Sequence, residues 1–115
     1  MRPSKLPLEP FTAGDHFDGI PTVAITVNGA APASAMALVT MRFKKKDFPN
    51  GTPVELSSAD DEITIESAAN WEFSIPEQEV AGLTDGLWTW RIRVTDAAGV
   101  KKTYLADEIS VLETV

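Results

Sequence analysis

His16 is the only histidine of the chain, and histidine is the side chain best suited to acid–base chemistry near neutral pH. A Ser-His-Asp site could use it, since serine and aspartate are plentiful. However, no Gly-x-Ser-x-Gly turn or other nucleophile motif accompanies it. We therefore interpret His16, which lies beside Asp15 and close to Asp18, as a surface residue. We expect no enzyme, and catalysis by His16 is kept as an alternative hypothesis.

The best candidate metal ligands are acidic. The run Asp60–Glu62 could offer carboxylate oxygens to a hard cation such as Ca²⁺. It lacks the alternating acidic positions, central glycine and closing glutamate of an EF-hand loop, so we interpret it, and likewise Asp107–Glu108, as solvated. The chain has no cysteine, which excludes thiol nucleophiles and thiolate metal sites. GxxxxGK and GxGxxG phosphate loops are also absent. We expect no metal and no cofactor.

A short basic run could bind a partner. Lys44–Lys46 is flanked by Phe43 and Phe48. Nucleic-acid binding requires a wider basic face, and the chain carries a formal net charge of −7, so we expect no nucleic-acid partner. Lysines at a strand end also discourage unwanted edge pairing. We interpret the segment as a solvent-exposed loop and as a candidate for protein interaction.

Three tryptophans could carry a different function. Trp71, Trp88 and Trp90 could line a carbohydrate-binding face, which would need at least two exposed rings. Each of them belongs to a series of large apolar residues at every second position, so in a strand these side chains share one face. This pattern instead predicts core packing. A carbohydrate-binding module is kept as the alternative function.

The elements that must position these residues are strands. In the hairpin Gly86–Val111, the segment Trp88–Val94 alternates large apolar residues with polar ones that include Arg91 and Arg93. Such a period of two is typical of a half-buried antiparallel strand. The turn Asp96–Gly99 leads into a second strand, and we expect a third, short edge strand after it.

Similar but shorter patterns recur along the chain. We predict further strands at 11–17, 20–27, 36–43, 54–56, 63–66 and 70–75. Proline and Asn-Gly signals predict a long exposed loop at 44–53. An early proline and a late glycine predict one helical turn at 76–83. Short strands separated by strong turn signals are typical of an all-β antiparallel sandwich of about seven or eight strands.

Length and composition indicate one domain. The chain has 115 residues, and three of its eight prolines lie in the first ten positions. We therefore predict an extended proline-rich arm at 1–10, mobile unless it docks on a neighbour, and a single sandwich domain at 11–115. A membrane helix requires about 20 apolar residues, and no segment of the chain has them. The apolar core of a signal peptide is also missing. We expect synthesis in the cytoplasm and no membrane partner.

The order of short motifs in the chain resembles a known family. The motifs are Gly14-Asp15, Met41-Arg42-Phe43, Ile63-Thr64-Ile65, Ile75-Pro76, Leu83, Gly86-Leu87-Trp88-Thr89-Trp90, Val94-Thr95-Asp96, Gly99, Thr103-Tyr104 and Ile109-Ser110-Val111. This series, which spans about Phe11 to Glu113, resembles the small immunoglobulin-like β-sandwich domains of phage and prophage tail modules. It is similar to the N-terminal domain of baseplate upper proteins.

The resemblance implies a structural, non-catalytic virion protein that docks onto other tail or baseplate proteins, or onto copies of itself. Such a protein would be made in the bacterial cytoplasm and reside in the tail when a phage assembles. We expect the docking residues at exposed loops and at the last, edge strand, because edges are natural pairing sites. The interaction candidates are Lys44, Lys45, Lys46, Asp47, Phe48, Ile109, Val111 and Leu112.

Overall fold

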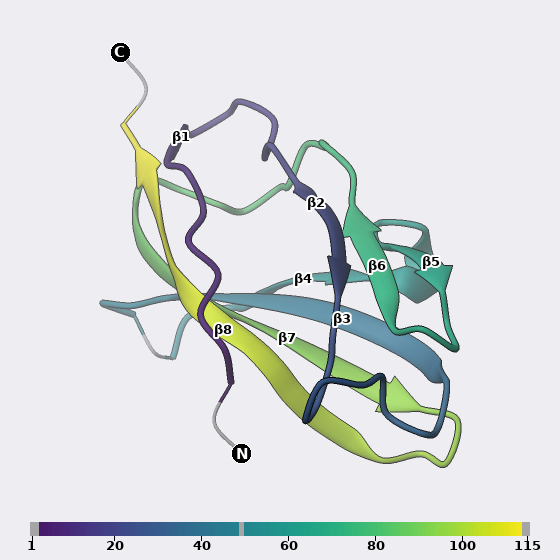
Figure 1. Cartoon of the computed structure of the whole chain (residues 1–115). Coiled ribbons are helices and arrows are strands. Elements are labelled where there is room, and N and C mark those ends of the chain that lie inside the picture. Colours follow the sequence, from purple (N-terminus) through teal and green to yellow (C-terminus); the bar gives the residue numbers. More distant parts are fainter. Residues whose placement is uncertain (1–2, 49, 114–115) are drawn as a thin grey trace.

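The computed structural model describes residues 3–48 and 50–113, in which eight strands form two packed sheets (Figure 1). The larger sheet has the order β1-β8-β7-β3-β4, and the smaller has the order β2-β6-β5. The elements are β1 (Phe11–Thr12), β2 (Ile20–Ala24), β3 (Met36–Lys45), β4 (Val54–Ser57), the 3₁₀ turn η1 (Ser58–Asp60), β5 (Thr64–Ser67), β6 (Glu72–Ile75), β7 (Gly86–Asp96) and β8 (Lys101–Leu112). This is the predicted all-β sandwich.

Residues 1, 2, 49, 114 and 115 lie outside the described residues. The predicted arm, the predicted 44–53 loop and the predicted end of the domain each include some of them. Within the described part of the chain, no helix is both long and apolar enough to cross a bilayer.

The core lies between the sheets and follows the predicted alternation. In β7, Trp88, Trp90, Ile92 and Val94 are at most 3% exposed. Neighbouring β3 and the facing β6 supply further core residues, namely Val39, Met41, Phe43, Phe73 and Ile75. Since β7 is the central strand of the larger sheet, its inner face lies over the middle of the core, which explains why two of the three tryptophans are found there.

The predicted third short strand is not a separate element, because β8 is a single strand that continues through Asp107 and Glu108. The register with β7 shifts between Ile92 and Arg93, so that one extra residue, Tyr104, is accommodated in β8. Such a bulge reverses which positions face the core. Leu105 is therefore buried, although the simple alternation places it on the same face as Lys101.

The far edge of β8 is covered by the N-terminal arm, which runs along it (Figure 1). The Ser4 amide donates to the Tyr104 carbonyl at 2.8 Å, and the Ala106 amide donates to the Ser4 carbonyl at 3.0 Å. Further on, β1 pairs in parallel with the end of β8. The predicted open pairing edge is thus occupied by the chain itself, which satisfies backbone groups that an edge strand would otherwise expose.

The helical turn predicted at 76–83 is wrong. Gln78 instead forms an extended bridge with Phe17, with amide-to-carbonyl distances of 2.9 and 3.1 Å. The observed 3₁₀ turn, η1, follows β4, and its N-cap Ser57 accepts a hydrogen bond from the Ala59 amide. Two predicted strands are also shorter than expected, since β1 ends at Thr12 and β2 ends at Ala24.

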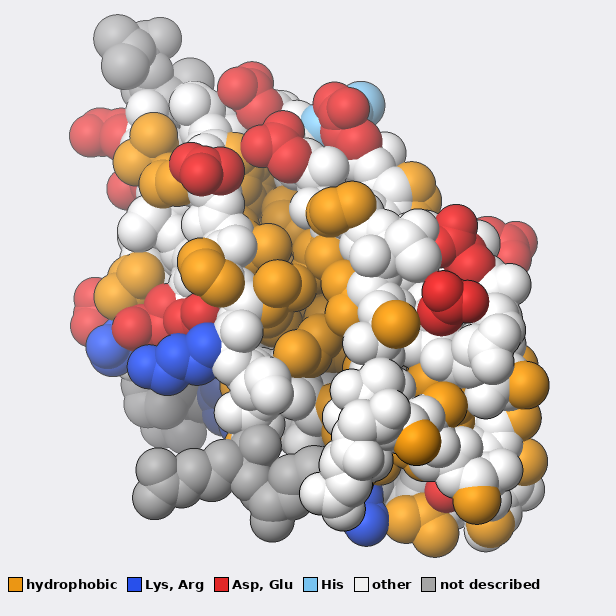
Figure 2. Space-filling model, in the orientation of Figure 1, with side chains coloured by type: hydrophobic (Ala, Val, Ile, Leu, Met, Phe, Trp, Pro, Cys, Tyr) orange, Lys and Arg blue, Asp and Glu red, His pale blue; other side chains and the backbone are white. Residues whose placement is uncertain are grey.

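The sandwich is open on the side where β1 and β2, the edges of the two sheets, lie. Figure 2 shows hydrophobic side chains at the bottom of a hollow between the arm and β2. The partly buried Leu6, Leu8 and Val23 pack against the core. The arm therefore contributes to the apolar packing of the domain as well as covering β8.

Candidate functional site

The histidine and the acidic run that were considered for catalysis and metal binding lie largely at exposed positions. His16 is exposed, and its Nδ1 lies 3.8 Å from a carboxylate oxygen of Glu77. In residues 3–48 and 50–113, no group of three or more metal-ligating side chains could hold an ion. The acidic run instead closes a turn, in which Asp61 adopts a left-handed conformation and Glu62 accepts a hydrogen bond from the Ser57 amide.

The three tryptophans lie in the core. Trp71, Trp88 and Trp90 are 1%, 3% and 2% exposed. The indole nitrogen of Trp71 donates to the Ser34 carbonyl at 2.7 Å, and that of Trp88 donates to the Thr84 carbonyl at 2.8 Å. None of the rings is available for stacking on a sugar, so the condition for a tryptophan-based carbohydrate site is not met.

Trp90 differs from Trp88 in one respect that can be tested. Its indole nitrogen is buried and has no hydrogen-bond partner among the described residues. Burying an unpaired donor costs about 1–3 kcal/mol. We expect Trp90→Phe to destabilise the fold by about 1–3 kcal/mol less than Trp88→Phe, because both lose similar volume but only Trp88→Phe loses a hydrogen bond. Urea unfolding of both variants measures the difference, and equal losses would contradict it.

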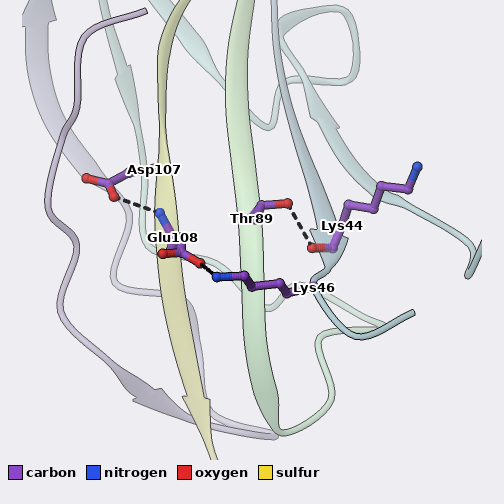
Figure 3. Close-up of polar contacts among 5 residues, drawn as sticks. All are labelled: Lys44, Lys46, Thr89, Asp107 and Glu108. Carbon is purple, nitrogen blue, oxygen red and sulfur yellow. Dashed lines mark hydrogen bonds and ion pairs between the residues drawn. The ribbon is translucent and has the colours of Figure 1, made fainter. Parts of the chain in front are cut away.

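The strand β3 extends through Lys45, so Lys44 and Lys45 lie in the strand rather than in the predicted loop, which begins at Lys46. The three lysine side chains point in different directions. Lys45 donates to the Thr84 hydroxyl at 3.0 Å and lies 5.4 Å from the Phe48 ring centroid. Lys46 forms an ion pair with Glu108 at 2.8 Å, which crosses β7 beside Thr89 (Figure 3). Lys44 points away from Lys46 in the same view. The three ammonium groups therefore do not converge on one phosphate.

The ion pair fixes the charge state of Lys46. The hydrogen bond from Lys46 to Glu108, together with the negative charge of Glu108, raises the pKa of Lys46 above its ordinary value. Lys46 therefore stays charged at neutral pH. Glu108 is consequently already neutralised by a neighbour on its own sheet.

The remaining interaction candidates differ in how far their side chains are exposed. Asp47 is exposed, Phe48 is 60% exposed and Leu112 is 50% exposed. Ile109 and Val111 are 2% and 3% exposed, because they point inward from β8. Their side chains form part of the core rather than an accessible edge. A binding role for this set of residues stays a prediction.

A surface that the sequence did not reveal lies on the outer face of the larger sheet. A cavity of ≈ 570 Å³ is bounded there by β3, β4, β7, β8 and the start of the arm. We call it the cationic groove, after its basic side chains Lys5, Arg42, Lys44, Arg91 and Arg93. These are half of the ten lysines and arginines in a chain whose net charge is −7.

The register between β3 and β7 places positively charged side chains close together in the groove. Arg42 of β3 lies directly opposite Arg91 of β7, and Arg93 lies opposite Thr40. Like charges directly opposite one another on adjacent strands repel. Within residues 3–48 and 50–113 the ion pairs are His16–Glu77 and Lys46–Glu108. Three carboxylates, Glu55, Asp107 and Glu108, also line the groove, and Glu55 of β4 lies opposite Arg42 on its other side. Among the described residues no ion pair joins Arg42 or Arg91 to any of them, so the two guanidinium groups can still bind an external anion.

This arrangement predicts that the groove is slightly destabilising in the free protein. We expect Arg91→Gln to raise the free energy of unfolding by about 0.2–1 kcal/mol, because it removes the repulsion from Arg42. The gain should shrink at high salt, which screens exposed charges. Thermal unfolding at two salt concentrations measures it. Arg93→Gln is the matched control, since Arg93 opposes a threonine; an equal gain in both variants would contradict the prediction.

Comparison with protein-family models, with curated proteins and with solved structures finds no match to this chain.

Proposed function

We propose that this protein is a structural, non-catalytic component of a phage or prophage tail or baseplate. In this proposal it docks onto an acidic protein surface through the cationic groove. The observation that carries the proposal is the opposed pair Arg42 and Arg91, which are exposed and form no ion pair among the described residues, although Glu55 lies opposite Arg42 on β4. Further support comes from the sandwich fold and from the motif order shared with tail-module domains.

The chemistry of the groove favours carboxylates on a protein. Arginine presents a planar fork of donors that matches a carboxylate with two parallel hydrogen bonds. A nucleic acid, by contrast, extends its charge beyond the groove, and binding it requires a wider basic face. A local acidic patch on a protein contacts only the groove.

The decisive experiment measures binding to the proteins encoded by the neighbouring genes, which the proposal expects to include tail or baseplate proteins. Each is purified and titrated with the protein by biolayer interferometry. We expect at least one to bind, and Arg42→Gln/Arg91→Gln to weaken it by at least about tenfold, since one charge-assisted hydrogen bond is worth about 1.5–3 kcal/mol.

The control variant is Lys101→Gln/Lys102→Gln, which removes the same charge from two exposed lysines outside the groove. It should bind as the unmodified protein does. If no neighbour binds, or if both double variants weaken binding equally, the groove is not the docking site.

A further inference from the structure

A second charged surface lies at one end of the molecule. The extended bridge between Phe17 and Gln78 holds two segments side by side. Together they carry four exposed carboxylates, which we call the acidic end: Asp15, Asp18, Glu77 and Glu79. Figure 2 shows acidic side chains gathered beside the histidine at the top of the molecule. No lysine or arginine of the described residues forms an ion pair with this end.

The acidic end and the cationic groove share no residue, so one copy of the chain could use both at once. A two-fold dimer through either surface would place like charges against each other, because such an interface joins the same patch on both subunits. The opposite charges meet only where the groove of one copy contacts the acidic end of another, either head to tail or reciprocally in a dimer that contains both patches. Opposed charges across an interface both steer association and suppress wrong pairings.

We propose that the groove binds the acidic end of a second copy, so that copies of this protein assemble head to tail. The inference rests on the proposed function in assigning docking to the groove, and it names the partner. The loop between β1 and β2 lies at the top of Figure 1, where it can reach a neighbour. Its carboxylates would meet Arg42, Arg91 and Arg93 of the next copy. Such a contact closes into a ring or continues as a filament, depending on the rotation between copies.

The test uses two variants that each lose one half of the contact. The groove variant is Arg42→Gln/Arg91→Gln, and the end variant is Glu77→Gln/Glu79→Gln. In sedimentation velocity, the unmodified protein should form species larger than a dimer as its concentration rises. These species should be present at about 0.01 M salt and lost at about 1 M, where the Debye length falls from about 30 Å to about 3 Å.

Each variant alone should be monomeric. An equimolar mixture should form a dimer and nothing larger, because the intact groove of the end variant binds the intact acidic end of the groove variant. Asp60→Asn/Asp61→Asn removes two exposed carboxylates elsewhere, and Lys101→Gln/Lys102→Gln removes two exposed lysines. Both control variants should assemble as the unmodified protein does.

Three results would overturn the head-to-tail contact: an unmodified protein that forms nothing larger than a dimer, a single variant that still assembles, or a mixture without dimers. The proposed function is tested separately. If the unmodified protein is monomeric but its groove still binds a tail or baseplate protein, only the identity of the partner is wrong. If the groove variant changes neither measurement, both proposals fail.

Discussion

Gly19→Ala is expected to remove most of the stability of the fold. Gly19 has a φ of +81°, and a Cβ atom there would overlap the Ile75 carbonyl oxygen and lie 2.9 Å from the Pro76 carbonyl carbon. These are backbone atoms at the end of β6, exactly where β2 begins to pair, so no side chain can rotate away. We expect a loss of at least about 4 kcal/mol, from a total that is about 5–15 kcal/mol in proteins of this kind.

Gly29→Ala is the matched control for this substitution. Gly29 has nearly the same φ, +83°, but a Cβ atom there meets nothing within 4 Å. Only the left-handed backbone strain remains, which is roughly 1–2 kcal/mol. Urea unfolding of the two variants separates the clash from the strain, and equal losses would refute the clash. Because Gly19 follows Asp18, the same turn also positions the acidic end.

Phe43→Ala is expected to cost about 3–5 kcal/mol, the usual range for removing a buried phenylalanine. Phe43 is 0% exposed and packs edge-on against Phe17, with ring centroids 5.8 Å apart. Phe17 in turn packs against Phe11 at the same centroid distance. The cluster thereby joins the inner face of β3 to the segments that carry the acidic end. For a domain of this size the loss lowers the melting temperature by about 4 °C per kcal/mol.

Phe48→Ala is the control, since Phe48 is the same residue type but 60% exposed. The free energy of unfolding of the Phe48→Ala variant should stay within about 0.5 kcal/mol of that of the unmodified protein. Thermal unfolding followed by circular dichroism measures both variants. If the two substitutions lowered the melting temperature equally, Phe43 would not have the central packing role described above. Since Arg42 and Lys44 flank Phe43 on the outer face of β3, loosening this strand should also weaken docking at the groove.

The identity of the strands and their inner faces could be predicted from the sequence alone. In Trp88–Val94 the side chains alternate between the two faces, because successive residues of an extended chain point in opposite directions. This is a property of a few neighbouring residues, and it places the tryptophans in the core. The same alternation placed Arg91 and Arg93, two of the five basic side chains of the groove, together on the outer face.

Which residues lie beside those of β7 was decided only by the tertiary structure. Arg42 opposes Arg91 because β3 and β7 pair in one particular register, and register depends on the packing of whole faces rather than on local residue types. For the same reason the sequence did not reveal the bulge at Tyr104, the parallel pairing of the arm with β8, or the bridge between Phe17 and Gln78. Local alternation thus determined the strands and the core, whereas contacts between distant segments determined the groove and the acidic end.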